Sequence, residues 1–407
     1  MAFSLGNGQD ISYVKEQAEI LSSARMKGRG YVDRGLDRAA QHIAAEFKNL
    51  GLKPYGKHYF QEFDHKVNTF PGKMELTIDS QEMQPGADFI VDPASPLFAG
   101  RLRAQVYDGN NLQTLPSLEV LQEECENCLI VLDMQDVEEK EVLKEARQLK
   151  YLLSDFAPVI WLKDEKRTWG VSNQQLEYPI IECASNLLVD GSLVEIKIEA
   201  VFESSFTSKN VIGYIPGSKY PDSLIAFTAH YDHLGMMGDD ACFFGANDNA
   251  SGTAYILSLA KHYMDYPPEC TLAFIAFAGE EAGLVGSRYF VENPLFPLEN
   301  LKFVINLDLM GSGVEGITVV NARSQTREFD LLETLNRTHD LLPQIKARGQ
   351  APNSDHYYFS EAGVPAIFIY ALGGSTAYHD IYDVSSNLTF EEYNDIFKLL
   401  TLFVNKL

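Results

Sequence analysis

The chain has 407 residues, 45% of them hydrophobic, so it can bury a large core arranged as two domains or as one domain with an insertion. Its formal net charge of -24 at pH 7 repels phosphate backbones and anionic lipid headgroups, which argues against nucleic acid and membrane surfaces as partners. No apolar stretch approaches the roughly 20 residues needed to cross a bilayer.

The N-terminal part predicts one clear helix. Residues 1–6 lack the basic and apolar segments of a secretory signal, so we expect either a cytoplasmic protein or one whose leader was removed. Over residues 36–50, apolar side chains recur at helical spacing, and Gly51 stands where a C-terminal cap belongs. We therefore expect a helix that ends at Gly51.

From about residue 65 to residue 207 the sequence pattern becomes typical of short strands and loops, with one charged helical run over residues 137–149. We interpret 65–207 as a smaller, β-rich inserted domain within a domain made of 1–64 and 208–407. It contains Cys125 and Cys128, a CxxC pair whose spacing allows a disulfide, a metal or redox element, or two incidental thiols.

After residue 210, apolar runs typical of strands alternate with helical patterns. The expected strands are 211–215, 224–228, 272–277, 303–307 and 366–370, and the expected helices are 251–264, 327–341 and 389–404. This alternation predicts an α/β layered fold with a largely parallel sheet. Ligands of such sheets collect at the carboxyl ends of the strands.

Ionisable residues follow these strands closely. They are His230 and Asp232, then Glu280 and Glu281, then Asp308, then His379 and Asp383, with Asp248 in a Gly-rich loop that opens a helix. Imidazoles and carboxylates would therefore meet at one edge of the sheet. Nitrogen and oxygen ligands suit zinc, and paired metal ions occur in aminopeptidases and phosphatases.

The order of the motifs is His-x-Asp, Asn-Asp-Asn-Ala-Ser-Gly, Glu-Glu, Asn-Leu-Asp, Ser-Asp-His and a late His. This order resembles the co-catalytic zinc aminopeptidase family, which includes leucyl aminopeptidases, glutamate carboxypeptidases, the transferrin receptor ectodomain and glutaminyl cyclases. The resemblance implies a three-layer sandwich around a central, mostly parallel mixed sheet. The insertion corresponds in position to the apical or protease-associated domain of some members.

Carried over residue by residue, the resemblance implies two zinc ions per chain that share Asp248 as a bridging carboxylate. His230 and Asp308 would complete one zinc site, and Glu281 and His379 the other. A hydroxide between the ions would attack the peptide bond.

The resemblance also implies two supporting residues. Glu280 would be the general base that takes a proton from water and passes it to the leaving amine. Asp232 would accept the second imidazole hydrogen of His230 and fix its tautomer.

Other residues near the motifs receive separate expectations. Ser354, Asp355 and His356 either line the pocket, support the metal site or are structural. Asp383 is either a partner of the metal shell or a helix cap. Glycines 235 and 238 suggest an exposed loop, so His233, Asp239 and Asp240 are expected outside the site.

The function expected from the resemblance is hydrolysis of N-terminal peptide bonds in peptides with a free amino terminus. The alternatives are a single-zinc glutaminyl cyclase and a catalytically inactive, receptor-like binding module. Carboxypeptidase or dipeptidase activity is less favoured, because Arg288, Arg323 and Arg348 are scattered in sequence and form no basic cluster beside the motifs. The role of the insertion is open between a lid and a structural part. Relatives with such an insertion are often exported, and the oligomeric state is not indicated.

Overall fold

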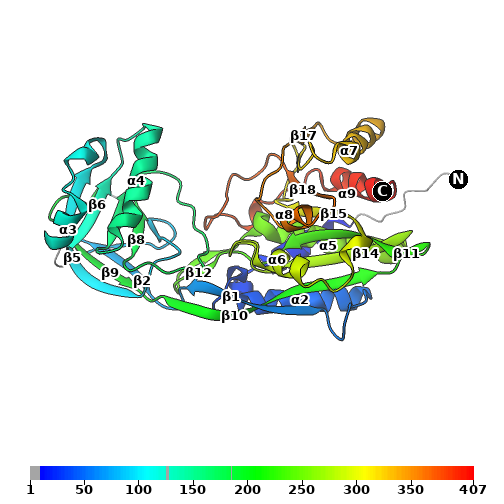
Figure 1. The fold of residues 1–407 in the computed structure, drawn as a ribbon, viewed down its shortest axis with the longest axis horizontal. Helices are drawn as coiled ribbons and strands as arrows, with labels where there is room; N and C mark the ends of the chain where they lie inside the picture. The colour runs from blue at the N-terminus through cyan, green and yellow to red at the C-terminus, as the bar shows by residue number, and fades with distance from the viewer. Residues whose placement is uncertain (1–9, 125–127, 185) are drawn as a thin grey trace.

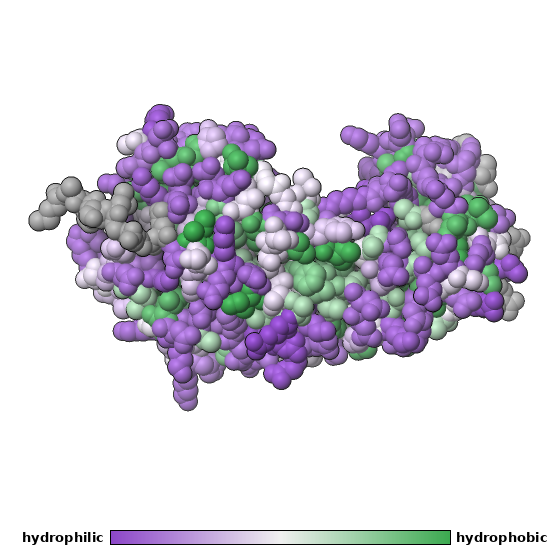
Figure 2. Space-filling model, turned by 180° about the vertical axis from the view of Figure 1, so that it is seen from behind, coloured by the Kyte–Doolittle hydropathy of each residue, from purple (hydrophilic) through white to green (hydrophobic). Residues whose placement is uncertain are grey.

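The computed structural model describes residues 10–124, 128–184 and 186–407. The molecule is elongated and has two lobes, each built on its own mixed sheet (Figure 1). Within the described residues, no helix is both long enough and apolar enough to cross a membrane. Figure 2 shows that one face is mostly hydrophilic, as the acidic composition implies, with hydrophobic side chains gathered near its middle.

The larger lobe contains a mixed sheet with a parallel centre. Its strands, in spatial order, are β1 (Phe60–Thr69), β10 (Val201–Ile215), β14 (Cys270–Phe277), β11 (Tyr220–His230), β15 (Leu301–Asp308), β18 (Ala366–Ala371), β16 (Ile317–Val320) and β17 (Ile345–Ala347). Strands β14, β11, β15 and β18 run parallel, while β10 and β16 pair antiparallel on either side of them. The carboxyl ends of the four central strands therefore share one edge.

Helices cover both faces of this sheet, which makes three layers (Figure 1). On β11, Ile225 and Phe227 pack on one face, and Leu224 and Ala226 pack on the other, as the period of two in a strand requires. The first face carries α1 (Ile11–Leu21), α2 (Gly35–Leu50), α5 (Gly252–Asp265), α7 (Thr326–His339) and α9 (Tyr393–Val404). The second carries α6 (Val285–Glu292) and α8 (His356–Glu361).

Short segments complete this lobe. They are the 3-10 turns η1 (Ala24–Arg29), η4 (Leu298–Asn300) and η5 (Ser385–Asn387), the π-helical turn η3 (Ala246–Ser251) and the hairpin of β12 (Gly235–Met237) and β13 (Ala241–Phe243).

The strands and helices predicted after residue 210 are confirmed, as is the first helix, which ends at Gly51 with a left-handed φ of 91°. The last helix begins at Tyr393 and not at residue 389. Phe390 has a φ of 51°, which is incompatible with a right-handed helix.

The smaller lobe has a second mixed sheet. Its strands, in spatial order, are β3 (Gln81–Met83), β2 (Met74–Ile78), β9 (Leu193–Ile198), β5 (Phe98–Asp108), β6 (Cys128–Asp133), β7 (Val159–Leu162), β8 (Ile180–Cys183) and β4 (Phe89–Val91). The turn η2 (Gly109–Thr114) and helices α3 (Leu118–Glu124) and α4 (Lys140–Leu153) accompany it, with α3 and α4 on one face. The other face packs on the β12–β13 hairpin through Met237 and Phe243, so one apolar core joins the two lobes.

The predicted domain limits at residues 64/65 and 207/208 fall inside paired strands. Strands β1 and β10 pair from Phe60 with Val211 to Thr69 with Val201, so the antiparallel ribbon runs across both limits. The domain division itself stays a prediction. The three alternatives for the CxxC pair concern Cys125, which lies outside the described residues.

Candidate active site

The predicted metal ligands meet at the carboxyl edge of the parallel strands. His230 ends β11, Asp308 ends β15, Glu281 follows β14 and His379 follows β18. Asp248 lies in η3, directly before α5. Because β14, β11, β15 and β18 are neighbours in the sheet, chain segments far apart in sequence deliver these side chains to one place.

Asp248 lies between two groups of these side chains. One of its oxygens is 3.3 Å from Nε2 of His230, and the other is 3.0 Å from Nε2 of His379. Nε2 of His230 is also 3.3 Å from Asp308, and Nε2 of His379 is 3.4 Å from Glu281. A carboxylate with one oxygen toward each imidazole has the arrangement that bridging requires.

The electrostatics of this cluster favour a cation. Burial alone would raise the pKa of Asp248, yet hydrogen bonds from His230 and His379 hold it well below its ordinary value. Burial raises the pKa of Asp308 and of Glu280, and the carboxylate of Glu281 adds to both. Several carboxylates lie close together in a poorly solvated place, so their negative charges repel one another. A divalent ion would neutralise this repulsion.

The donor set and its geometry fit zinc. The candidate ligand atoms of His230, Glu280 and Asp308 all lie within 4.8 Å of one another, as do those of His230, Asp248 and Glu281. Oδ1 of Asp308 is buried and has no hydrogen-bond partner within the described part of the chain. An unsatisfied carboxylate oxygen among imidazoles and other carboxylates is what a site for a nitrogen- and oxygen-ligated ion leaves in its absence.

Asp232 contacts His230 through its main-chain carbonyl and, at a longer distance, through its carboxylate. Nδ1 of His230 is 3.2 Å from the main-chain carbonyl of Asp232 and 3.7 Å from its carboxylate. That carboxylate accepts hydrogen bonds of 3.2 Å from the backbone N–H groups of Glu280 and Glu281 and from the hydroxyl of Tyr31. A carbonyl only accepts, so it fixes Nδ1 of a neutral His230 as the donor, while the carboxylate holds the Glu280–Glu281 turn.

The expectation that His233 is solvent-exposed is wrong. Its ring is fully buried, and Nδ1 lies 2.8 Å from Oε1 of Glu281, whereas Asp239 and Asp240 are exposed as expected. Gly235 allows a close backbone approach, since a Cβ there would lie 2.8 Å from Cα of Gly30. The glycine therefore marks tight packing rather than an exposed loop. A second His three residues after His230, just beyond a buried strand, was the available signal.

Asp383 supports the Asp248 loop and starts no helix. Its buried carboxylate accepts hydrogen bonds from the backbone N–H of Asn247, at 2.8 and 3.1 Å, and of Asp248, at 3.0 Å. Ser354 donates to Asp308 at 3.4 Å, and Asp355 and His356 are fully buried. The described lining of the cavity at this site includes none of these three residues.

Arg29, which the sequence did not single out, holds the same loop from the other side. The guanidinium is fully buried and donates to the carbonyls of Tyr231, Leu21, Phe244, Gly245 and Asp248 at 2.6 to 3.2 Å. Burial lowers the pKa of Arg29 to about 10, against the raising effect of Asp383 and Asp248.

Replacing Arg29 with Met should destabilise the fold by about 3–5 kcal/mol, because several buried carbonyls lose a charged donor at about 1–3 kcal/mol each. Urea unfolding measures this loss. Arg34→Met is the matched control, since the Arg34 side chain is 79% exposed and pairs with the carboxylate of Asp37. We expect the control to stay within about 1 kcal/mol of wild type. Equal unfolding midpoints for both variants would contradict this role of Arg29.

The cluster opens into a cavity of about 520 Å³. Glu280 lies in its wall beside the five predicted ligand residues, and the lining also includes Arg348, Tyr370 and Tyr378. This volume suits a short peptide or a similar small ligand. The structure therefore brings Arg348 to the site although its sequence position gave no such indication.

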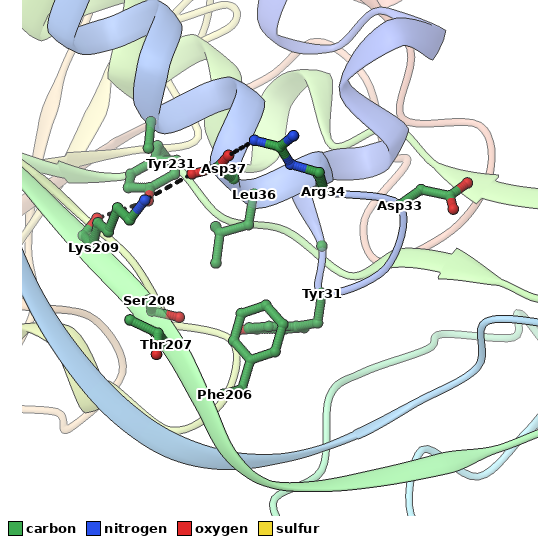
Figure 3. Close-up of a pocket in the computed structure, with 12 residues that line it drawn as sticks. Tyr31, Asp33, Arg34, Leu36, Asp37, Phe206, Thr207, Ser208, Lys209 and Tyr231 are labelled. Atoms are coloured by element: carbon green, nitrogen blue, oxygen red, sulfur yellow. Dashed lines mark hydrogen bonds and ion pairs between the residues drawn. The ribbon is translucent and has the colours of Figure 1, made fainter.

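A second cavity of about 320 Å³ lies next to Tyr31, the residue whose hydroxyl donates to Asp232 (Figure 3). Tyr31 and Phe206 form part of its wall, and Asp37 pairs there with Lys209 at 2.8 Å and with Arg34 at 2.6 Å. Its described lining includes none of the predicted metal ligands. The chemistry therefore belongs to the larger cavity.

Comparison with known proteins agrees with this geometry. Residues 210–404 match the model of peptidase family M28. Aminopeptidase YwaD of Bacillus subtilis is 31% identical over 206 residues, which covers 48% of this chain and 43% of that protein. A probable zinc metalloprotease of Pyricularia oryzae is 37% identical over 105 residues, 25% of this chain and 21% of that protein. The chain thus spans less than half the length of these two curated relatives.

Solved structures share the whole fold. The structure of BSAP, a zinc aminopeptidase from Bacillus subtilis, superposes with a TM-score of 0.72 at 18% identity, over 98% of this chain and 95% of that one. An aminopeptidase from Aneurinibacillus sp. strain AM-1 gives a TM-score of 0.64 at 19% identity, over 98% and 94%. Both likenesses extend across the insertion and confirm the expected α/β architecture. Residues 210–404, slightly less than half of this chain, are thus similar to peptidase family M28.

Proposed function

We propose that this chain is a zinc-dependent aminopeptidase, which binds two zinc ions and hydrolyses the first peptide bond of substrates that have a free amino terminus. The observation that carries this proposal is the meeting of His230, Asp248, Glu281, Asp308 and His379 at one edge of the sheet, with Asp248 between the two imidazoles. Relatives named aminopeptidase and zinc metalloprotease support the same reaction class.

The ligands divide around Asp248. His230 and Asp308 would hold one zinc ion, Glu281 and His379 the other, and Asp248 both. Bound zinc would supply a Lewis acid that polarises the scissile carbonyl and lowers the pKa of water.

Glu280 provides the proton transfer. Its carboxyl group lines the cavity, and burial with the neighbouring carboxylates of Glu281 and Asp355 raises its pKa well above the ordinary value, against the opposing effect of His230. A carboxylate in this position can take the proton of the attacking water and donate it to the leaving amine.

One carboxylate of the cavity can attract a substrate ammonium group. Glu280 lines the cavity and is assigned to neither zinc ion, and an unprotonated carboxylate attracts a cation most strongly in a poorly solvated place. A free amino terminus is therefore expected to bind at this end of the cavity.

Arg348 supports a second candidate function. It is exposed, lines the same cavity and makes no ion pair with the described residues, so it could receive the C-terminal carboxylate of a substrate. A carboxypeptidase or dipeptidase would use this contact. The relative named aminopeptidase still favours the first function.

Four forms of one tripeptide separate these functions: unmodified, N-acetylated, C-amidated and blocked at both ends. The aminopeptidase cleaves the unmodified and amidated forms and leaves both acetylated forms intact, as product analysis by mass spectrometry would show. Hydrolysis of the acetylated acid, without hydrolysis of the amide, would replace this function with a carboxypeptidase. A peptide with N-terminal glutamine tests the glutaminyl cyclase, which would form pyroglutamate.

A further inference from the structure

A segment of the insertion contacts the loop that carries His379. The backbone N–H of Trp169 donates to the carbonyl of His379 at 2.8 Å, and Nδ1 of His379 lies 3.0 Å from the carbonyl of Trp169. Beside this pair, Nζ of Lys166 lies 3.0 Å from Asp380 and donates to the carbonyl of Thr376 at 2.8 Å. We name residues 166–169 the His379 brace.

The brace is anchored in the insertion and its apolar junction with the larger lobe. Trp169 is buried, and its indole N–H donates to the carbonyl of Val91 at 2.9 Å. Its ring packs against Phe243, at 4.7 Å between centroids, and against Phe70, at 5.7 Å. Arg167 donates to the carbonyl of Ala87. The position of the brace is thus set by elements outside the sheet that carries the other metal ligands.

His379 needs such external contacts. Its φ of 54° lies in the left-handed region, which is costly for a residue with a side chain and persists where the surroundings hold it. The ring of Tyr378 stacks on the imidazole, with centroids 4.0 Å apart, but Tyr378 is 45% exposed and belongs to the same loop. The brace is therefore a buried support of this ring that comes from another part of the chain.

The contact also selects the nitrogen that faces the metal site. A carbonyl oxygen only accepts hydrogen bonds, so the neutral ring carries its hydrogen on Nδ1. Nε2 then presents its lone pair where Asp248 and Glu281 lie, at 3.0 and 3.4 Å. A metal-bound histidine normally needs a partner of this kind on its second nitrogen.

We propose that the His379 brace makes the insertion a positioning part of the metal site: it sets the orientation and tautomer of His379 and thereby strengthens zinc binding at the Glu281–His379 position. This inference rests on the proposed two-zinc site. It gives the insertion a role in assembling the site that does not require movement of a lid.

Zinc affinity at each position tests the brace. The full chain and its Lys166→Ala and Trp169→Phe variants are dialysed against buffers of fixed free zinc, and bound zinc is counted. Because the side chain of Lys166 is 47% exposed, its replacement should leave the fold intact. We expect one of two ions to bind about 10–100-fold more weakly in both variants, while the other keeps its wild-type affinity. Lys166→Arg should restore the affinity.

The matched control is Lys197→Ala, which removes an exposed ion pair of 2.9 Å with Glu199 elsewhere in the insertion. It should bind zinc as wild type does, and the metal-free Lys166→Ala chain should unfold at the wild-type temperature. Wild-type zinc affinity at both positions in both brace variants would contradict the proposed positioning role. Equally weakened binding of both ions, together with a lowered unfolding temperature, would contradict it as well. A wild-type chain that binds no zinc would instead contradict the proposed function on which the brace rests.

Discussion

Replacing Glu280 with Gln should lower kcat by about 10²–10⁴-fold and leave two zinc ions bound. Glutamine has the size of glutamate and keeps the backbone N–H that donates to Asp232 at 3.2 Å, so the turn should be retained. An amide cannot take the proton of the attacking water, so the loss falls on the chemical step. Steady-state kinetics and metal analysis of one sample measure both quantities.

Glu292→Gln is the control for this substitution. Glu292 lies on α6 and forms an exposed ion pair of 2.9 Å with Arg288, so its replacement should change neither kcat nor metal content. A Glu280→Gln variant that holds two zinc ions and turns over at the wild-type rate would refute the general-base role. A variant that loses zinc would show that Glu280 is a ligand, which its closeness to His230 and Asp308 also permits.

Replacing Asp248 with Ala should weaken binding at both zinc positions by at least about 100-fold, since loss of a direct ligand should exceed the 10–100-fold typical of supporting residues. The reason is geometric, because the two carboxylate oxygens face different imidazoles at 3.3 and 3.0 Å. Hydrolysis should fall with zinc content. Equilibrium dialysis measures the metal, and circular dichroism checks the fold.

Asp239→Ala, in the exposed loop of the β12–β13 hairpin, is the matched control and should bind two zinc ions. Loss of one ion only from Asp248→Ala would contradict the bridging role. Loss of both ions from the control as well would point to general unfolding.

The larger lobe was predictable because its signals are local. Apolar runs in β11, β14, β15 and β18 have the length of buried strands, and an ionisable residue ends or closely follows each of them. Parallel strands place such residues at one edge whatever the details of packing. The meeting of His230, Glu281 and Asp308 follows from that rule.

The supports of the site were not predictable, because each depends on contacts between segments far apart in the chain. Arg29 binds carbonyls from residue 21 to residue 248, and Trp169 reaches His379 across more than 200 residues. Gly235 was misinterpreted for the same reason, since its partner Gly30 lies in another element. A single sequence shows that a glycine or an arginine is present but not what packs against it.

In the insertion, too, the secondary structure was predictable and the contacts with the rest of the chain were not. Its strands and its charged helix are visible in the sequence, whereas its contact with the metal site consists largely of main-chain groups of Trp169 and His379. Main-chain hydrogen bonds leave no mark on the pattern of residue types. The two roles expected for the insertion, a lid or a structural part, therefore did not include the positioning of His379.

Titration of the metal-free chain with zinc tests the central claim most directly, with bound zinc and release of the N-terminal residue measured in the same samples. We expect hydrolysis to be absent without zinc and binding to saturate at two ions per chain. An N-acetylated peptide should stay intact throughout. Saturation at one ion per chain with full activity, or hydrolysis that persists in the metal-free chain, would contradict the central claim.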